Sequence, residues 1–205
     1  KGQLIAPLRL YRMPVSEHLP SVGEGGVPAF LMRVPAAART SLLDALEKYI
    51  IIDDVRFTPL RAWGELQLIG PEARSVLQEA TGVALSSLAA NHMQPLDEAS
   101  GLLIADEPLR TRPTLRLIGP LERLQGLLER IAPIAQQRPG GGPLGWADQE
   151  RLRIIEGVPR FGVDASETPV AKEAGLEAAV SYNKGCYPGQ ETTYRLHYRG
   201  QPAAR

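Results

Sequence analysis

The sequence predicts an α+β fold in which helices cover one face of an antiparallel sheet. Two observations support this prediction. Segments with the features of strands and amphipathic helices follow one another as ββα and again ββα between residues 55 and 134. A hydrophobic content of 43% in 205 residues is enough for a buried core and argues against a disordered chain. The repeated order indicates two similar halves that share one sheet.

A β-hairpin and a helix are expected in the first quarter of the chain. Apolar and polar residues alternate unevenly over 4–13, and 27–34 is a second apolar run. The glycine-rich stretch between them is typical of a turn. Apolar side chains then recur at helical spacing as far as Ile50, and Thr40 or Ser41 is expected to cap this amphipathic helix.

The middle of the chain supplies the two ββα units. Short runs rich in apolar residues predict strands, and longer segments with apolar positions at helical spacing predict helices. The expected strands are 55–60, 63–69, 101–105 and 114–118, and the expected helices are 71–80, opened by Pro71, and 121–134.

A proline- and glycine-rich stretch at 139–143 is the clearest linker in the chain. Residues 146–155 after it are expected to form a helix that returns the chain to the first sheet. The first predicted domain is therefore discontinuous and joins residues 1–52 to 144–205. The second, an α+β (ββα)2 subdomain, occupies 53–138.

Composition limits the possible partners and the location of the protein. Lys plus Arg and Asp plus Glu number 23 each, so the chain as a whole does not strongly attract nucleic acid or anionic membrane. No apolar run approaches the roughly 20 residues needed to cross a bilayer, and the first residues lack the apolar core of a signal peptide. We therefore expect a soluble, cytoplasmic protein. The single cysteine, Cys186, and the histidines His18, His92 and His197 have no metal-ligand spacing, so no resident metal is expected.

The octapeptide at 184–191 reads Lys-Gly-Cys-Tyr-Pro-Gly-Gln-Glu and contains that cysteine. Glycine and proline favour tight turns around the thiol, and Lys184 favours its thiolate form. A loop of this kind presents the sulfur of Cys186 rather than burying it. Two other interpretations stay open: a cysteine that fills a small apolar gap, and a nucleophile that uses His197 as its base.

Residues 184–191 resemble the signature of the YgfZ-type folate-binding proteins, relatives of the glycine-cleavage T-protein (aminomethyltransferase). In that family Lys-Gly-Cys-(Tyr/Phe)-x-Gly-Gln-Glu is followed by an arginine. Residues 153–164 are similar to the family's Arg-(Ile/Val)-Glu-x-Gly-(Ile/Val)-Pro stretch, and 168–175 resemble its Pro-x-Glu-Ala element. When the sequences are aligned on Gly157, the family's glutamate falls on Ile155, so that Glu156 is displaced by one position.

The resemblance implies a cloverleaf of subdomains around a central cavity in which tetrahydrofolate, or a one-carbon derivative of it, binds. Cys186 and Lys184 would form the functional, catalytic pair. Folate joins an anionic tail to a flat ring with polar edges, so its site needs cations, apolar walls and hydrogen-bonding groups. The expected folate-binding residues are Glu156, Tyr182, Lys184, Tyr187, Gln190, Glu191 and Arg195.

The family is linked to the maintenance of iron-sulfur enzymes, including those that modify tRNA. The resemblance therefore implies folate as ligand and iron-sulfur proteins as partners reached through Cys186. Residues 1–5 resemble a Lys-Gly-Arg element that lies inside family members, and residues 200–205 stop where these continue into a small β-barrel. We therefore expect that terminal segments of the family are missing from this chain.

Two other functions stay open. A tetrahydrofolate-dependent aminomethyltransferase would need an acidic residue for methylene transfer, and none can be assigned in this chain, so glycine-cleavage activity is not expected. A non-enzymatic module would use the loop around Cys186 only to dock partners. The residues also leave open whether any reaction is catalysed and which form of folate binds.

Overall fold

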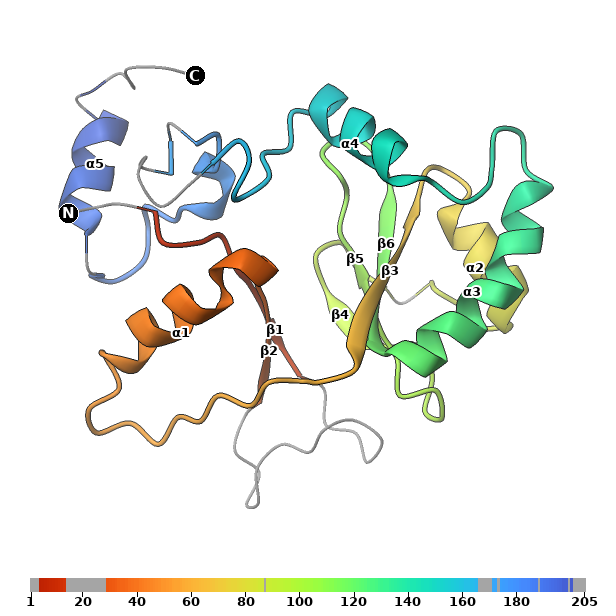
Figure 1. Cartoon of the computed structure of the whole chain (residues 1–205), viewed down its shortest axis with the longest axis horizontal. Helices are drawn as coiled ribbons and strands as arrows, with labels where there is room; N and C mark the ends of the chain where they lie inside the picture. Colours follow the sequence, from red (N-terminus) through yellow and green to blue (C-terminus); the bar gives the residue numbers. More distant parts are fainter. Residues whose placement is uncertain are drawn as a thin grey trace. The chain divides into compact units, whose positions relative to one another are not determined.

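The computed structural model describes residues 4–13, 29–86, 88–165, 171–172, 174–187, 189–198 and 200 (Figure 1). The chain divides into two compact units, each made of segments that are not consecutive. Unit 1 comprises Lys1–Arg9, Met32–Phe57 and Gly157–Arg205, and unit 2 comprises Leu10–Leu31 and Thr58–Glu156. The domain boundaries expected from the sequence, after residues 52, 138 and 143, stay a prediction.

Unit 2 is built on a four-stranded antiparallel sheet with the strand order β3-β6-β5-β4. Its strands are β3 (Trp63–Ile69), β4 (Met93–Pro95), β5 (Leu103–Asp106) and β6 (Thr114–Pro120). The register places Leu117 of β6 opposite both Leu66 of β3 and Ile104 of β5. These three apolar side chains therefore share one face of the sheet.

Two helices, α2 (Ala73–Thr81) and α3 (Leu121–Gln136), lie on that face of the sheet (Figure 1). Their buried side chains form one apolar cluster with every second residue of the central strands. Its members include Leu68, Val76, Leu77, Ile104, Leu115, Leu117, Leu124, Leu127 and Ile131. Since each fully buried side chain of this size contributes about 1.5–3 kcal/mol, this layer is the main source of stability in unit 2.

A smaller cluster covers part of the opposite face of the sheet. Leu103, Ala105 and Ile118 from the sheet pack there with Tyr11, which is also buried. Tyr11 lies in β1 (Arg9–Arg12), which pairs with β2 (Phe30–Arg33). The two strands pair as the expected hairpin requires. The turn expected between them lies outside the described residues, so the hairpin connection stays a prediction.

Three of the sequence predictions for this architecture are wrong. Residues 55–60 form no strand, because most of their side chains are exposed and β-propensity alone does not hold an unpaired segment extended. The short strand β4 was not expected. As a result, the observed order is β3-α2-β4-β5-β6-α3 rather than two ββα repeats. The third wrong prediction is the N-cap of the first helix, which is neither Thr40 nor Ser41.

The helix α1 (Arg39–Glu47) follows the 3-10 turn η1 (Ala36–Ala38), so its N-cap is Ala38 rather than Thr40 or Ser41. The Ser41 hydroxyl instead donates a hydrogen bond to the carbonyl oxygen of Ala38 at 3.2 Å. The other helices agree better with the sequence. The helix α4 (Trp146–Ile155) has the predicted bounds, and α2 begins two residues after Pro71. Within the described residues, no helix has both the length and the apolarity needed to cross a membrane.

Candidate functional site

The segment 184–191, called here the cysteine loop, lies in unit 1 after the 3-10 turn η2 (Glu177–Ala179), and its last two residues begin the helix α5 (Gln190–Tyr198). Cys186 is exposed, as expected for a loop that presents its thiol. An exposed cysteine does not serve as core filler, which removes the packing interpretation. Pro188 lies outside the described residues, as do His18, 168–169 and Arg199.

Gln190 closes the cysteine loop. Its side-chain oxygen Oε1 accepts a hydrogen bond from the backbone N–H of Tyr187 at 3.1 Å, and its own N–H donates to the Tyr187 carbonyl at 3.2 Å. Between them, Gly189 has a φ of +83°, a conformation that favours glycine. The first residue of α5 therefore also fixes the conformation at the end of the loop. The expected contact between Gln190 and the pterin ring of folate stays a prediction.

The Lys184 ammonium lies over the ring of Tyr187, with Nζ 4.4 Å from the ring centroid. A cation in this position is attracted by the face of the aromatic ring. The structure thus brings together the expected cation and one of the expected aromatic walls, on either side of Cys186 in the sequence.

Four aromatic side chains, called here the aromatic group, pack against one another beside the loop: Tyr182, Tyr194, His197 and Tyr198. The Tyr182 ring stacks on the His197 imidazole, with centroids 3.7 Å apart and planes 22° apart. Tyr194 and Tyr198, four residues apart on α5, have centroids 4.5 Å apart. His197 meets Tyr198 edge to face at 4.7 Å. The group joins α5 to the chain that precedes the cysteine loop.

Glu177 provides the charge beside this group. Its Oε1 lies 3.2 Å from Nδ1 of His197 and accepts a hydrogen bond from the Tyr182 hydroxyl at 3.5 Å. Burial and the nearby Glu177 carboxylate raise the pKa of Tyr182 above its usual value. A hydrogen bond with Tyr194 raises the pKa of Tyr198. Both phenols are therefore neutral at pH 7 and able to donate hydrogen bonds.

Glu191 and Arg195, both expected to bind folate, form an ion pair with each other. Arg195 Nη2 lies 2.6 Å from Glu191 Oε1, one turn away on α5, and both side chains are largely exposed. An exposed pair of this kind is worth little to stability, so either group exchanges this partner for another at low cost. Their folate contacts stay predictions.

Glu156, which was also expected to bind folate, lies in unit 2 and is held there by hydrogen bonds. Its carboxylate accepts hydrogen bonds from the Thr111 hydroxyl at 2.9 Å and from Nε of Arg112 at 2.6 Å, and its side chain is 8% exposed. The hydrogen bonds from Thr111 and Arg112 lower the pKa of Glu156. The carboxylate therefore holds the end of α4 to the turn between β5 and β6, and its predicted contact with the folate ring stays untested.

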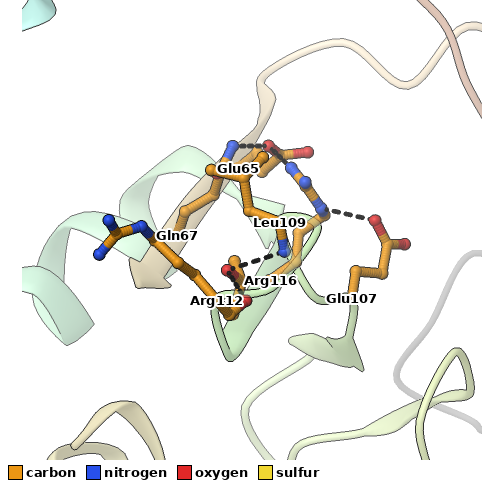
Figure 2. Close-up of polar contacts among 7 residues, drawn as sticks. Glu65, Gln67, Glu107, Leu109, Arg112 and Arg116 are labelled. Atoms are coloured by element: carbon orange, nitrogen blue, oxygen red, sulfur yellow. Dashed lines mark hydrogen bonds and ion pairs between the residues drawn. The ribbon is translucent and has the colours of Figure 1, made fainter. Parts of the chain in front are cut away.

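An ionic cluster on the sheet, centred on the buried side chains of Arg116 and Glu107, was not anticipated from the sequence (Figure 2). Arg116 of β6 lies between two carboxylates: its Nε donates to Glu107 at 3.0 Å, and its Nη1 donates to Glu65. Gln67 adds a hydrogen bond to the same Glu65 oxygen at 2.7 Å. Arg116 itself is the feature of the sequence that could have pointed to this cluster, because it lies between Leu115 and Leu117 in a predicted strand. A charge that is buried in a sheet requires oppositely charged partners.

No family model matches the chain. It is 28% identical over 202 residues to the tRNA-modifying protein YgfZ of Yersinia enterocolitica, a match that covers 98% of this chain and 54% of that protein. It is 26% identical over 176 residues to the YgfZ of Colwellia psychrerythraea, covering 84% and 50%. It is also 28% identical over 143 residues to an aminomethyltransferase of Lysinibacillus sphaericus, covering 69% and 39%.

Among solved structures, the chain resembles the glycine cleavage system aminomethyltransferase T of Bartonella henselae, with a TM-score of 0.67 and 17% identity. This match covers 94% of the chain and 54% of the solved one, and it shows the fold. The chain spans about half, or less, of the length of the relatives it matches. The resemblance to the YgfZ-type proteins and to their aminomethyltransferase relatives is thus confirmed, and the chain has the α+β fold of aminomethyltransferase T.

Proposed function

We propose that this protein binds tetrahydrofolate, or a one-carbon derivative of it, through the aromatic group and the cysteine loop. In the cytoplasm it would use Cys186 to support iron-sulfur cluster assembly or repair and, through iron-sulfur enzymes, tRNA modification. The observation that carries the proposal is the exposed thiol in a loop joined directly to a helix with exposed aromatic rings. The similarity to proteins named as tRNA-modifying YgfZ supports the same assignment.

The side chains around the loop suit the parts of a folate. Tyr194 and Tyr198 are 49% and 58% exposed, so their rings offer a flat apolar surface for a pterin or a benzoyl ring. Lys184 supplies a cation for the anionic tail, and among the described residues its contact is the Tyr187 ring rather than a carboxylate. Arg195 becomes a second cation when Glu191 is displaced.

The chemistry of Cys186 favours a helper rather than a cluster carrier. One thiolate supplies one ligand, whereas iron-sulfur clusters normally take four protein ligands. Among the described His, Cys, Asp and Glu residues, none gather in a group of three that could hold a metal ion. In this proposal, Cys186 therefore meets a cluster or a thiol on a partner protein, while the folate lies beside it.

Isothermal titration of the full-length protein with tetrahydrofolate tests the folate part of the proposal. Binding is expected, and Lys184→Ala and Tyr198→Ala are each expected to weaken it about tenfold, the effect of losing one charge-assisted or stacking contact. Asp148→Asn on α4 is the matched control and should leave the affinity unchanged. Absence of binding at millimolar folate would remove folate from the proposed function. Equal affinity in all variants would reject the cysteine loop and the aromatic group as the folate site.

A second candidate is a folate-dependent aminomethyltransferase, favoured by the similarity to the Lysinibacillus enzyme and by the shared fold. Production of methylene-tetrahydrofolate with the other glycine-cleavage components, at about one turnover per second or faster, would put this candidate first. We expect no such activity, because the chain has no assignable acid for methylene transfer and a cysteine loop that the transfer does not require.

A further inference from the structure

The helix α5 is too short to be stable by itself. It has nine residues, and isolated helices of fewer than about 12–15 residues are marginal in water. Its order therefore depends on contacts with the rest of unit 1. Among the described residues, Tyr182 contacts the rings of Tyr194, His197 and Tyr198 on α5. Glu177 contacts His197.

The order of α5 is transmitted to the cysteine loop through Gln190. This residue begins the helix and holds Tyr187 by two hydrogen bonds, one from its backbone and one to its side chain. If α5 leaves Tyr182, the first helical turn loses its support and Gln190 loses its fixed position. The conformation around Cys186 is thus coupled to contacts made at the other end of the helix.

The contact that docks α5 pairs a histidine with a carboxylate, and the strength of that pairing depends on whether the imidazole carries a second proton. When the His197 imidazole is neutral, its Nδ1 shares one hydrogen bond with Glu177. When it is protonated, that bond becomes charge-assisted, and the cation also faces the rings of Tyr182 and Tyr198. Lys172 lies 3.9 Å from the same Glu177 oxygen and already neutralises part of its charge, which limits the gain.

We propose that His197 and Glu177 are positioning residues that dock α5 on Tyr182 and so hold the cysteine loop, more firmly when His197 is protonated. The proposal deepens the proposed function and rests on it for the importance of Cys186. The three residues that form this docking contact, Glu177, Tyr182 and His197, lie outside the motif at 184–191.

Hydrogen exchange of the full-length protein, read by mass spectrometry on peptides that cover 185–192, tests the proposal. Protection factors, which correct for the intrinsic pH dependence of exchange, are expected to be about two- to fivefold higher at pH 6 than at pH 8, as for a partly exposed ion pair. His197→Phe keeps the stacked ring but should remove this pH dependence. Glu177→Gln keeps an acceptor oxygen without the charge and should remove it as well.

His92→Phe is the matched control, because it removes another histidine by the same change, and it should retain the wild-type pH dependence. The proposal is overturned if the wild-type protection does not depend on pH, or if the dependence survives in either Glu177→Gln or His197→Phe. A tetrahydrofolate titration on the same proteins separates the two ideas. Lack of binding with an intact pH dependence would reject the folate site and leave the docking contact in place.

Discussion

The sheet of unit 2 and the cysteine loop of unit 1 are held together by different kinds of contact. In the sheet, leucine and isoleucine side chains from β3, β5, β6, α2 and α3 are almost fully buried in one cluster. Around the loop, Cys186 is exposed, and α5 is held by stacked rings and by hydrogen bonds whose partners are partly exposed. Stability is therefore concentrated in one region, and accessible chemistry in the other.

The chain thus keeps a stable scaffold in unit 2 apart from the candidate site in unit 1. A region with few buried apolar contacts opens locally at a lower free energy than a packed core, which suits a loop that must meet a ligand or a partner. Substitutions that test the comparison should have large effects on unfolding in the sheet and small ones near the loop.

Arg116→Met should have the largest effect, because it removes the buried guanidinium that pairs with the buried carboxylate of Glu107 (Figure 2). The free energy of unfolding, measured by urea denaturation, should fall by about 3–5 kcal/mol. Arg195→Met, which breaks the exposed pair with Glu191, is the matched control and should cost about 0.3–0.5 kcal/mol. Equal costs for the two would show that the sheet is not the stable region.

Leu127→Ala on α3 removes a fully buried side chain from the apolar cluster. A loss of about 2–5 kcal/mol is expected from the missing burial and the cavity left behind, again by urea denaturation. Leu121→Ala, on the same helix but 55% exposed, is the control and should change stability by less than about 0.5 kcal/mol. A small effect at Leu127 would mean that the helix repacks easily.

Glu156→Gln should have an effect that depends on pH. Contacts with Thr111 and Arg112 favour the ionised carboxylate, so the pKa of Glu156 is lower in the folded protein than in the unfolded chain. Its contribution to stability is therefore fully present above the ordinary glutamate value of about 4.3 and is lost as the pH falls through the lower, folded value. Urea denaturation should show wild type more stable than the variant at pH 7, with a difference that shrinks as the pH falls below the ordinary glutamate value. A constant difference would contradict the ionic contact.

Cys186→Ser should have the smallest effect on unfolding, within about 0.5 kcal/mol, because the thiol is exposed. In cells that lack the native gene, the variant should reach its normal level and yet fail to restore the activity of iron-sulfur enzymes. Full restoration by the serine variant would leave the loop without a role for its sulfur and favour a partner-docking module.

The sequence predicted the elements that satisfy a local pattern. Both α4 and β3 have the expected bounds, because apolar spacing defines each of them within its own segment. Residues 55–60 have the same local appearance as a strand but pair with no strand in the described part of the chain, and strand partners are set by the tertiary fold. The brief strand β4 carries too few residues for any periodicity.

The candidate site shows the same limit. Cys186, Lys184, Tyr187 and Gln190 could be singled out because they lie in one octapeptide. Glu177 could not, because it is 20 residues from His197 in the sequence and meets it only through the fold. Glu156 could be located by its position near Gly157, but the Thr111 and Arg112 side chains that fix its carboxylate lie more than 40 residues away.

The double role of Gln190, which begins α5 and closes the cysteine loop, has a thermodynamic consequence. A molecule that binds the rings of α5 and one that binds the thiol of Cys186 each order the same short stretch of chain, so the second to arrive has less entropy to remove. Their affinities are then linked reciprocally: any factor by which a folate strengthens the attachment of a thiol partner is the factor by which that partner strengthens the retention of folate.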